Sequence, residues 1–169
     1  PFRVLFPVGW LIGISGVMLW PLTFAGIHQF YPNVMHGRMM IEGFMGAFVF
    51  GFLATAGPRL TDTARFSIAE LGGLLTLLLA AVGLHIGHQT FWGDACFLLL
   101  LCGFVTTLGR RFFQKGADLP PPGMVLVGPG FLCAIGGTVG LMLAENGLLS
   151  GPWANFSRVL LYEMWVLFL

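Results

Sequence analysis

Long apolar segments alternate with short polar breaks along the chain. Six such segments can be drawn, at about Leu5 to Ile27, His36 to Ala56, Ser67 to Ile86, Thr90 to Leu108, Gly123 to Ala144, and from Phe156 onward. A helix needs about 20 apolar residues to cross the hydrocarbon core of a bilayer, and these runs are too continuous for the alternating pattern of a membrane β-strand. The pattern therefore predicts an all-α, polytopic membrane helix bundle with about six transmembrane helices.

Composition agrees with this interpretation and excludes other classes of protein. Of the 169 residues, 57% are hydrophobic and only 9% are charged, and the formal net charge is +1. A soluble domain has about 25% charged residues, and a nucleic-acid-binding protein needs a basic patch that this chain lacks. We therefore expect the lipid bilayer as a partner and no binding of nucleic acid.

The apolar run that begins near Phe156 is too short, as drawn, to cross a bilayer. A helix of about 14 residues rises only about 21 Å at 1.5 Å per residue, against about 30 Å of hydrocarbon. We therefore expect residues 1–169 to form a single transmembrane helical domain and to be the N-terminal part of a longer chain.

Basic residues flank alternate breaks between the apolar segments. They are Arg3, Arg59, Arg65, Arg110, Arg111 and Lys115. Since cytoplasmic loops carry an excess of Lys and Arg, this asymmetry predicts a cytoplasmic N-terminus. Only Arg38 and Arg158 fall on the opposite side, each near the start of a predicted helix.

Glycines recur three or four residues apart within the predicted helices. The clearest groups are Gly9, Gly13 and Gly16; Gly43 and Gly46; and Gly136, Gly137 and Gly140. Small residues at this spacing let helix backbones approach closely in lipid, so the pattern predicts a tight bundle. Making room for a flat cofactor ring is the alternative.

All four histidines fall on the predicted outer side of the membrane. They are His28, His36, His85 and His88. Imidazole is the commonest metal ligand and a frequent axial ligand of haem iron, although a histidine at a helix end is also an ordinary interfacial residue. His85 and His88 are three residues apart, a spacing that places two nitrogens on one helical face and suits a metal ion.

His36 is the leading candidate for a haem ligand because of the residues that follow it. Met40 and Gly43 share a helical face with His36, so a ring-shaped ligand can meet the imidazole where glycine leaves space. The candidate haem-binding residues on this helix are therefore His36, Arg38, Met40 and Gly43.

Ionisable residues occur inside two of the predicted spans. Arg38 and Glu42 lie in the second helix, and Arg158 and Glu163 lie in the sixth. Ionisable groups within a bilayer are costly unless they are paired or functional, so each is a candidate site residue. Either arginine suits a haem propionate, because the guanidinium fork binds carboxylate bidentately. A structural ion pair, within a helix or between the two, is the alternative.

Several stretches of the chain resemble the N-terminal half of the NnrS family. They are Pro1-Phe2-Arg3-Val4-Leu5-Phe6-Pro7, Leu19-Trp20-Pro21, His36 through Gly43-Phe44, and Gly51-Phe52-Leu53-Ala54-Thr55-Ala56-Gly57-Pro58-Arg59. The resemblance covers the first two helices in register and the other four less distinctly. It implies a bacterial inner-membrane protein of about twelve helices that contains haem and copper. It also implies an association with nitric oxide, nitrosative stress or electron transfer, and a distant kinship with the haem-copper oxidase large subunit.

The chain departs from the family pattern at the start of the second helix. The family reads HxHxM there; His36 matches the first histidine and Met39 and Met40 match the continuation, but Arg38 replaces the second histidine. Arginine is not a neutral metal ligand. Only His36 is therefore carried over as a haem ligand, and a metal site that used the second histidine is lost or altered.

Three functions remain open from the sequence. The first is an NnrS-like haem-binding membrane protein, and the second is a cofactor-free accessory or structural subunit that contacts other membrane subunits. The third is a small-solute transporter in which Glu42 and Glu163 are the ionisable residues within the membrane. Motifs of hydrolases and nucleotide-binding proteins are absent, and the sequence assigns no reaction.

Overall fold

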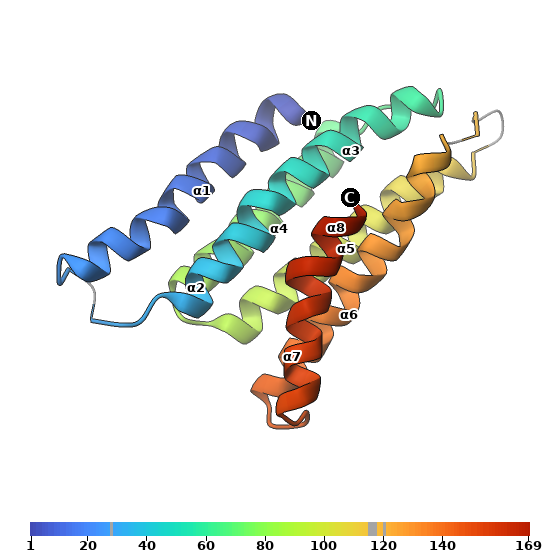
Figure 1. The fold of residues 1–169 in the computed structure, drawn as a ribbon. Coiled ribbons are helices and arrows are strands. Elements are labelled where there is room, and N and C mark those ends of the chain that lie inside the picture. Colours follow the sequence, from blue (N-terminus) through green and yellow to red (C-terminus); the bar gives the residue numbers. More distant parts are fainter. Residues whose placement is uncertain (28, 115–117, 120) are drawn as a thin grey trace.

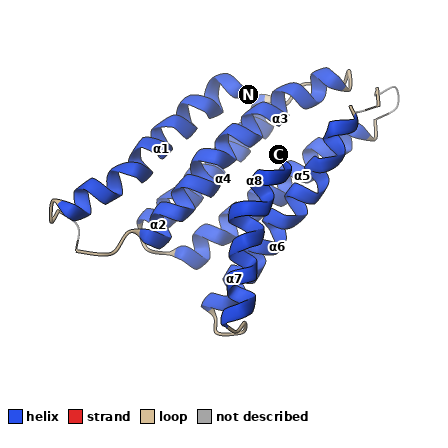
Figure 2. Cartoon of the chain, in the orientation of Figure 1, coloured by secondary structure: helices blue, strands red, loops and turns tan. Residues whose placement is uncertain are grey.

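The computed structural model describes residues 1–27, 29–114, 118–119 and 121–169. Figure 2 shows helices and loops and no strand in these ranges. The elements in chain order are α1 (Phe2–Phe24), α2 (Asn33–Arg38), the π-helix η1 (Met39–Met45), α3 (Gly46–Leu60), α4 (Ile68–Ile86), α5 (Thr90–Phe112), the 3-10 helix η2 (Pro122–Leu126), α6 (Val127–Glu145), α7 (Gly151–Val159), the π-helix η3 (Leu160–Met164) and α8 (Trp165–Phe168).

The described residues form six helical rods, because α2 continues through η1 into α3, η2 continues into α6, and α7 continues through η3 into α8 (Figure 1). Five rods are long and apolar enough to cross a membrane: Phe2–Phe24, Asn33–Leu60, Ile68–Ile86, Thr90–Phe112 and Pro122–Glu145. The sixth begins at Gly151, five residues before the start that the sequence predicted, and Pro152 lies in its first turn, where a missing N–H costs no helical hydrogen bond. The predicted all-α polytopic bundle is confirmed.

One end of the bundle can be recognised from contacts between distant segments. The Phe2 amide donates a hydrogen bond to Thr55 Oγ1 at 3.2 Å, and the Asp118 amide donates one to the Thr61 carbonyl at 2.9 Å. The N-terminus and the loops after α3 and α5 therefore share one end of the molecule, as Figure 1 also shows. This end carries Arg111, whose Nη2 pairs with Glu70 at 2.7 Å.

Glycines set the close contact between α1 and the second rod. A Cβ added at Gly9 would lie 2.8 Å from the Cβ of Ala47, and one at Gly13 would lie 2.6 Å from the Phe44 ring. Such separations are shorter than carbon atoms tolerate, so a larger residue would force the helices apart. The prediction that these glycines permit tight helix packing is confirmed.

An aromatic core joins the second rod to the C-terminal half of the bundle. Its rings belong to Phe50, Phe97, Phe104, Phe131 and Trp165, all of them buried. The Phe50 and Phe104 ring centroids are 4.9 Å apart, and Trp165 meets Phe97 edge-on at 5.7 Å. Because α3, α5, α6 and α8 each supply at least one ring, the core holds four helices in a single arrangement.

Candidate functional site

Arg38 lies at the centre of a buried polar cluster that joins three of the helices. Its Nη1 donates to Glu42 Oε1 at 2.8 Å, and its Nη2 donates to Asp94 Oδ2. The residues Arg38, Glu42, His85 and Asp94 are all at most 2% exposed. Burial of charges at this level is tolerated only where each charge is paired, and here one guanidinium bridges two carboxylates.

His85 completes the cluster from α4. Its Nε2 lies 3.0 Å from Glu42 Oε2 and 3.7 Å from Asp94 Oδ1. Each carboxylate therefore has one oxygen toward Arg38 and one toward His85. Glu42 Oε1 and Asp94 Oδ2 accept hydrogen bonds from Arg38, while Glu42 Oε2 and Asp94 Oδ1 face the imidazole. Three atoms, one each from Glu42, His85 and Asp94, lie within 4.8 Å of one another.

The backbone explains how these side chains come together. Glu42 lies on η1, a π-helical stretch of the kind that is frequent at functional sites, one turn after Arg38. Asp94 follows Gly93 just after the first turn of α5, and a Cβ at Gly93 would overlap the His85 ring, 2.6 Å from Nδ1. The absence of a side chain at Gly93 thus lets the imidazole lie directly against α5, beside Asp94.

Several polar atoms of the cluster are left without a partner. Among the described residues, Arg38 Nε, His85 Nδ1 and Asp94 Oδ1 are buried and make no hydrogen bond. A buried acceptor that lacks a partner costs about 1–3 kcal/mol, and such groups in native proteins usually bind water or an ion. The orphaned Asp94 oxygen is on the side of the carboxylate that faces His85.

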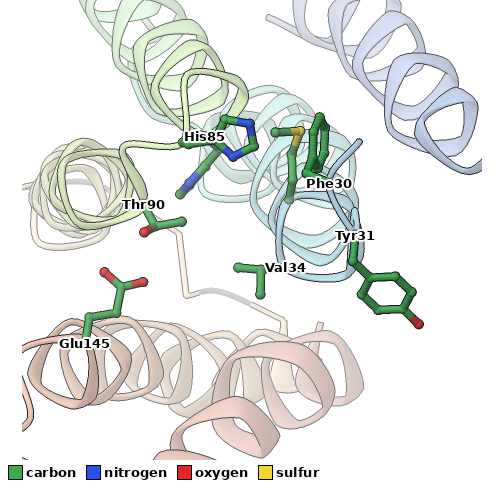
Figure 3. A pocket seen from close by; sticks show the side chains of 8 residues that line it. Phe30, Tyr31, Val34, His85, Thr90 and Glu145 are labelled. Carbon is green, nitrogen blue, oxygen red and sulfur yellow. The ribbon is translucent and has the colours of Figure 1, made fainter. Parts of the chain in front are cut away.

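A pocket of about 570 Å³ opens beside the cluster at the end of the bundle opposite the arginine-bearing loops. His85 forms part of its wall, together with Phe30, Tyr31, His88, Thr90 and Glu145. Figure 3 shows Glu145 across the pocket from His85, with Tyr31 and Val34 along the side. The pocket brings two histidines and an exposed carboxylate to the edge of the buried charges.

His36 lies apart from the cluster, at the contact between α1 and α2. Its Nδ1 is 2.9 Å from the carbonyl oxygen of Gly16, and its ring meets Trp20 edge-on with centroids 6.0 Å apart. Because a carbonyl only accepts, Nδ1 carries the proton and donates it to Gly16. The lone pair of the half-buried ring is then on Nε2.

The space beside Gly43 is filled by protein. A Cβ there would meet Ile12 at 2.6 Å and Val82 at 3.0 Å, so Gly43 serves contact among α1, η1 and α4. Met40 packs its sulfur against Gly16 and lines a groove on the α1 face. The room for a ring that the sequence predicted at Gly43 is therefore occupied by helix packing.

Two other sequence predictions meet a different geometry. His85 and His88 do not share a helical face, because α4 ends at Ile86 and His88 has a positive φ of 59° beyond it; His85 is buried and His88 is exposed. In the sixth rod, Arg158 and Glu163 are both exposed, and Arg158 Nη1 donates to Asn155 at 3.3 Å. Glu42 pairs with Arg38 and His85 instead of with this rod. His28 is outside the described residues.

Asp94 is the site residue that the sequence analysis missed. It lies in the fourth apolar segment, and an acidic residue inside a span is the same signal that identified Glu42. Its position beside Gly93 gave a second signal, since small residues mark close helix contacts. Neither signal predicts that Asp94 pairs with Arg38, because the two residues are 56 positions apart in the sequence.

Comparison with known families gives one match. The family described as NnrS protein matches residues 1–169, which is the whole chain. The chain belongs to the NnrS family. The resemblance drawn from the first two helices is thus confirmed and extends over all six rods of this NnrS protein, while no curated protein and no solved structure matches the chain.

Membership of the NnrS family agrees with the other features of the structure. The apolar rods suit a lipid bilayer, and the family is known for metal and haem cofactors in general. In the part of the chain that the structure describes, donor chemistry of that kind is found at His36, with its oriented imidazole, and in the cluster of Glu42, His85 and Asp94.

Proposed function

We propose that this chain is the haem-binding part of an NnrS-type protein of the bacterial inner membrane, with His36 as an axial ligand of the haem iron. The orientation of His36 carries the proposal. Its Nδ1–H donates to the Gly16 carbonyl at 2.9 Å, which leaves the lone pair on Nε2. Metal-ligating histidines are held in this way, with the second ring nitrogen donating to a carbonyl or carboxylate that fixes the tautomer and the ring.

The surroundings of His36 support a flat apolar ligand on the α1 side. Met40, one helical turn after His36, lines a groove of about 330 Å³ together with Val17 and Phe44; His36 does not line this groove, and Trp20 lies against its imidazole. These side chains offer the apolar surface that a porphyrin needs. We therefore propose that the porphyrin ring contacts the groove lined by Met40, and not the position of Gly43.

Arg158 is the better candidate of the two arginines for a propionate. Both terminal nitrogens of Arg38 are engaged with carboxylates, whereas Arg158 is exposed. Arg158 lies one turn before Tyr162, and the Tyr162 hydroxyl lies 3.2 Å from the position of a Cβ at Gly37, next to His36. Arg158 is therefore at the same end of the bundle as His36.

When bound, haem supplies an iron atom that binds small diatomic ligands such as nitric oxide, in keeping with the role implied by the family resemblance. The chain's own residues would hold the iron (His36), neutralise a propionate (Arg158) and exclude water (the apolar α1 face). Copper is not part of the proposal at this helix, since Arg38 stands where the family has a second histidine. We further propose that residues 1–169 form a single transmembrane helical domain.

His36→Ala tests the assignment. We expect the protein purified from haem-replete cells to show a Soret band, and His36→Ala to lose it or shift it, because the substitution removes an iron ligand. Added imidazole should restore the wild-type spectrum in His36→Gly, an outcome that a purely structural role of His36 would not produce. His88→Ala is the matched control and should keep the spectrum, since His88 packs against Phe30 at the pocket.

A wild-type spectrum and haem content in His36→Ala would show that His36 is not the ligand. A native protein that carries no haem after expression in haem-replete cells would contradict the haem proposal itself, and it would favour the function as a cofactor-free accessory subunit.

A further inference from the structure

We propose that Glu42, His85 and Asp94 form a site for one divalent metal ion of the first transition series, separate from the haem position at His36. The ligand atoms are Glu42 Oε2, His85 Nε2 and Asp94 Oδ1. They come from η1, α4 and α5, so the ion would join three helices that are already linked by the ion pairs of Arg38 and by the contact between His85 and Glu42.

The distances among the ligand atoms match those around a metal ion. His85 Nε2 is 3.0 Å from Glu42 Oε2 and 3.7 Å from Asp94 Oδ1. Nitrogen and oxygen ligands about 2.1 Å from a tetrahedral ion are about 3.4 Å from one another. The three side chains therefore need little movement to bind an ion between them.

Arg38 holds the two carboxylates in the orientation that binding requires. Its guanidinium donates hydrogen bonds to Glu42 Oε1 and Asp94 Oδ2, the carboxylate oxygens turned away from His85. Glu42 Oε2 and Asp94 Oδ1 are left facing His85. Ligating carboxylates are commonly fixed by such hydrogen bonds from outside the coordination sphere. Arg38 thus acts as a positioning residue and does not occupy the proposed site.

The buried polar atoms without a hydrogen-bond partner support a ligand between these side chains. Asp94 Oδ1 is fully buried and has no hydrogen-bond partner among the described residues, although it points toward the imidazole. A metal ion would satisfy this oxygen. His85 would then bind as a neutral imidazole with its proton on Nδ1, the nitrogen that is now unpaired.

The buried group carries an excess of negative charge. Glu42 and Asp94 supply two carboxylates against the single guanidinium of Arg38, so the group has a net charge of minus one when His85 is neutral, and Glu145 adds an exposed carboxylate on the wall of the adjoining pocket. This negative charge attracts a cation. The negative pocket beside His85 gives a cation a route from the surface.

The ligand set narrows the choice of ion. Two carboxylate oxygens and one imidazole suit Zn²⁺, Mn²⁺, Fe²⁺ or Co²⁺, while Cu⁺ prefers thiolate and thioether sulfur. Three protein ligands leave a fourth position for water or a small ligand, as in catalytic rather than structural zinc sites.

Titration of the purified, chelator-treated protein with Co²⁺ tests the proposal, because Co²⁺ has visible absorption bands that report low-symmetry nitrogen and oxygen coordination. We expect saturable bands that Zn²⁺ removes by competition, and a loss of affinity of more than about tenfold in Asp94→Asn. Asp94→Asn keeps the shape of the side chain and an oxygen that accepts from Arg38. Glu70→Gln, at the opposite end of the bundle, is the control and should bind Co²⁺ as the wild type does.

Two further measurements keep the test decisive if Asp94→Asn fails to fold. X-ray absorption at the cobalt edge of the wild-type protein should show a single imidazole among oxygen ligands. Gly93→Ala, which displaces the His85 ring, should weaken Co²⁺ binding, whereas Gly103→Ala on the same helix, where a Cβ meets no neighbour, should not.

Absence of saturable Co²⁺ binding, binding that is unchanged in Asp94→Asn, or a cobalt spectrum without imidazole would overturn the proposal. The result is separable from that at the haem position: His36→Ala should leave Co²⁺ binding intact, because His36 bonds to Gly16 and takes no part in the cluster.

Discussion

Arg38 neutralises acidic side chains on two helices. It is buried, and its guanidinium pairs with Glu42 and with Asp94. The two carboxylates in turn neutralise the buried arginine, so each of the three charges depends on the others.

Removal of Arg38 should therefore be strongly destabilising. Arg38→Ala leaves Glu42 and Asp94 buried without their partner, and we expect a loss of about 3–5 kcal/mol in the free energy of unfolding, the range found when one member of a buried ion pair is removed. Unfolding in mixed micelles with increasing denaturing detergent measures the change. Arg110→Ala removes an exposed arginine and should change stability by less than about 0.5 kcal/mol. Equal stability of the two variants would mean that the buried pairs contribute little.

At the scale of the helices, two rods contain a π-helical stretch. η1 interrupts the second rod, and η3 interrupts the sixth. The two segments come close, because Tyr162 on η3 lies against Gly37, just before η1. A π-helical turn rotates the residues that follow it, so η1 sets which side chains of the second rod face α4 and α5. Regular periodicity could not have predicted that rotation.

Close helix contact at Gly137 offers a direct test of packing between α6 and the sixth rod. A Cβ at Gly137 would lie 2.7 Å from the Leu161 backbone nitrogen and 2.8 Å from the Ser157 carbonyl, whereas one at Gly136 would meet only a Leu160 methyl at 3.8 Å. We expect Gly137→Ala to lower the free energy of unfolding by about 1–3 kcal/mol, since backbone atoms cannot move aside.

Gly136→Ala is the control, and it should be neutral or slightly stabilising because alanine favours helix over glycine. The same detergent titration compares the two variants. If Gly137→Ala were as stable as Gly136→Ala, the sixth rod would pack elsewhere on α6.

At the scale of the whole molecule, the two ends of the bundle differ in chemistry. The N-terminus and the loops after α3 and α5 share one end with several arginines, and the other end holds the pocket with His85, His88 and Glu145. This arrangement agrees with the basic-residue asymmetry of the sequence. We propose that the arginine-bearing end is cytoplasmic and the pocket opens on the outer side.

Cysteine labelling tests this orientation. In a variant whose three natural cysteines are replaced, we expect Leu148→Cys to react with an impermeant thiol reagent in intact spheroplasts, because Leu148 is exposed in the loop before α7. Ala64→Cys, in the loop between α3 and α4, should react only after lysis. The reverse pattern would show that the pocket faces the cytoplasm.

The sequence by itself determined the class of the protein, its six helical segments, the role of glycines such as Gly9 and Gly13 in close helix contacts, and its family. These properties are local: apolar runs of sufficient length become helices in lipid wherever they lie, and small residues at helical spacing permit close contact. The Arg38–Glu42 pair could also be predicted from the sequence, because the two residues are one helical turn apart.

Only the tertiary structure decided which groups meet across the helices. Asp94 joins Arg38 over 56 residues of sequence and His85 joins Glu42 over 43, and Gly43 is filled by Ile12 and Val82 instead of leaving room for a ring. Such contacts depend on how far each helix is rotated about its axis and where the π-helical η1 shifts that rotation. Rotation is set by packing against neighbours, which are not adjacent in sequence, so the pattern of any one segment does not contain it.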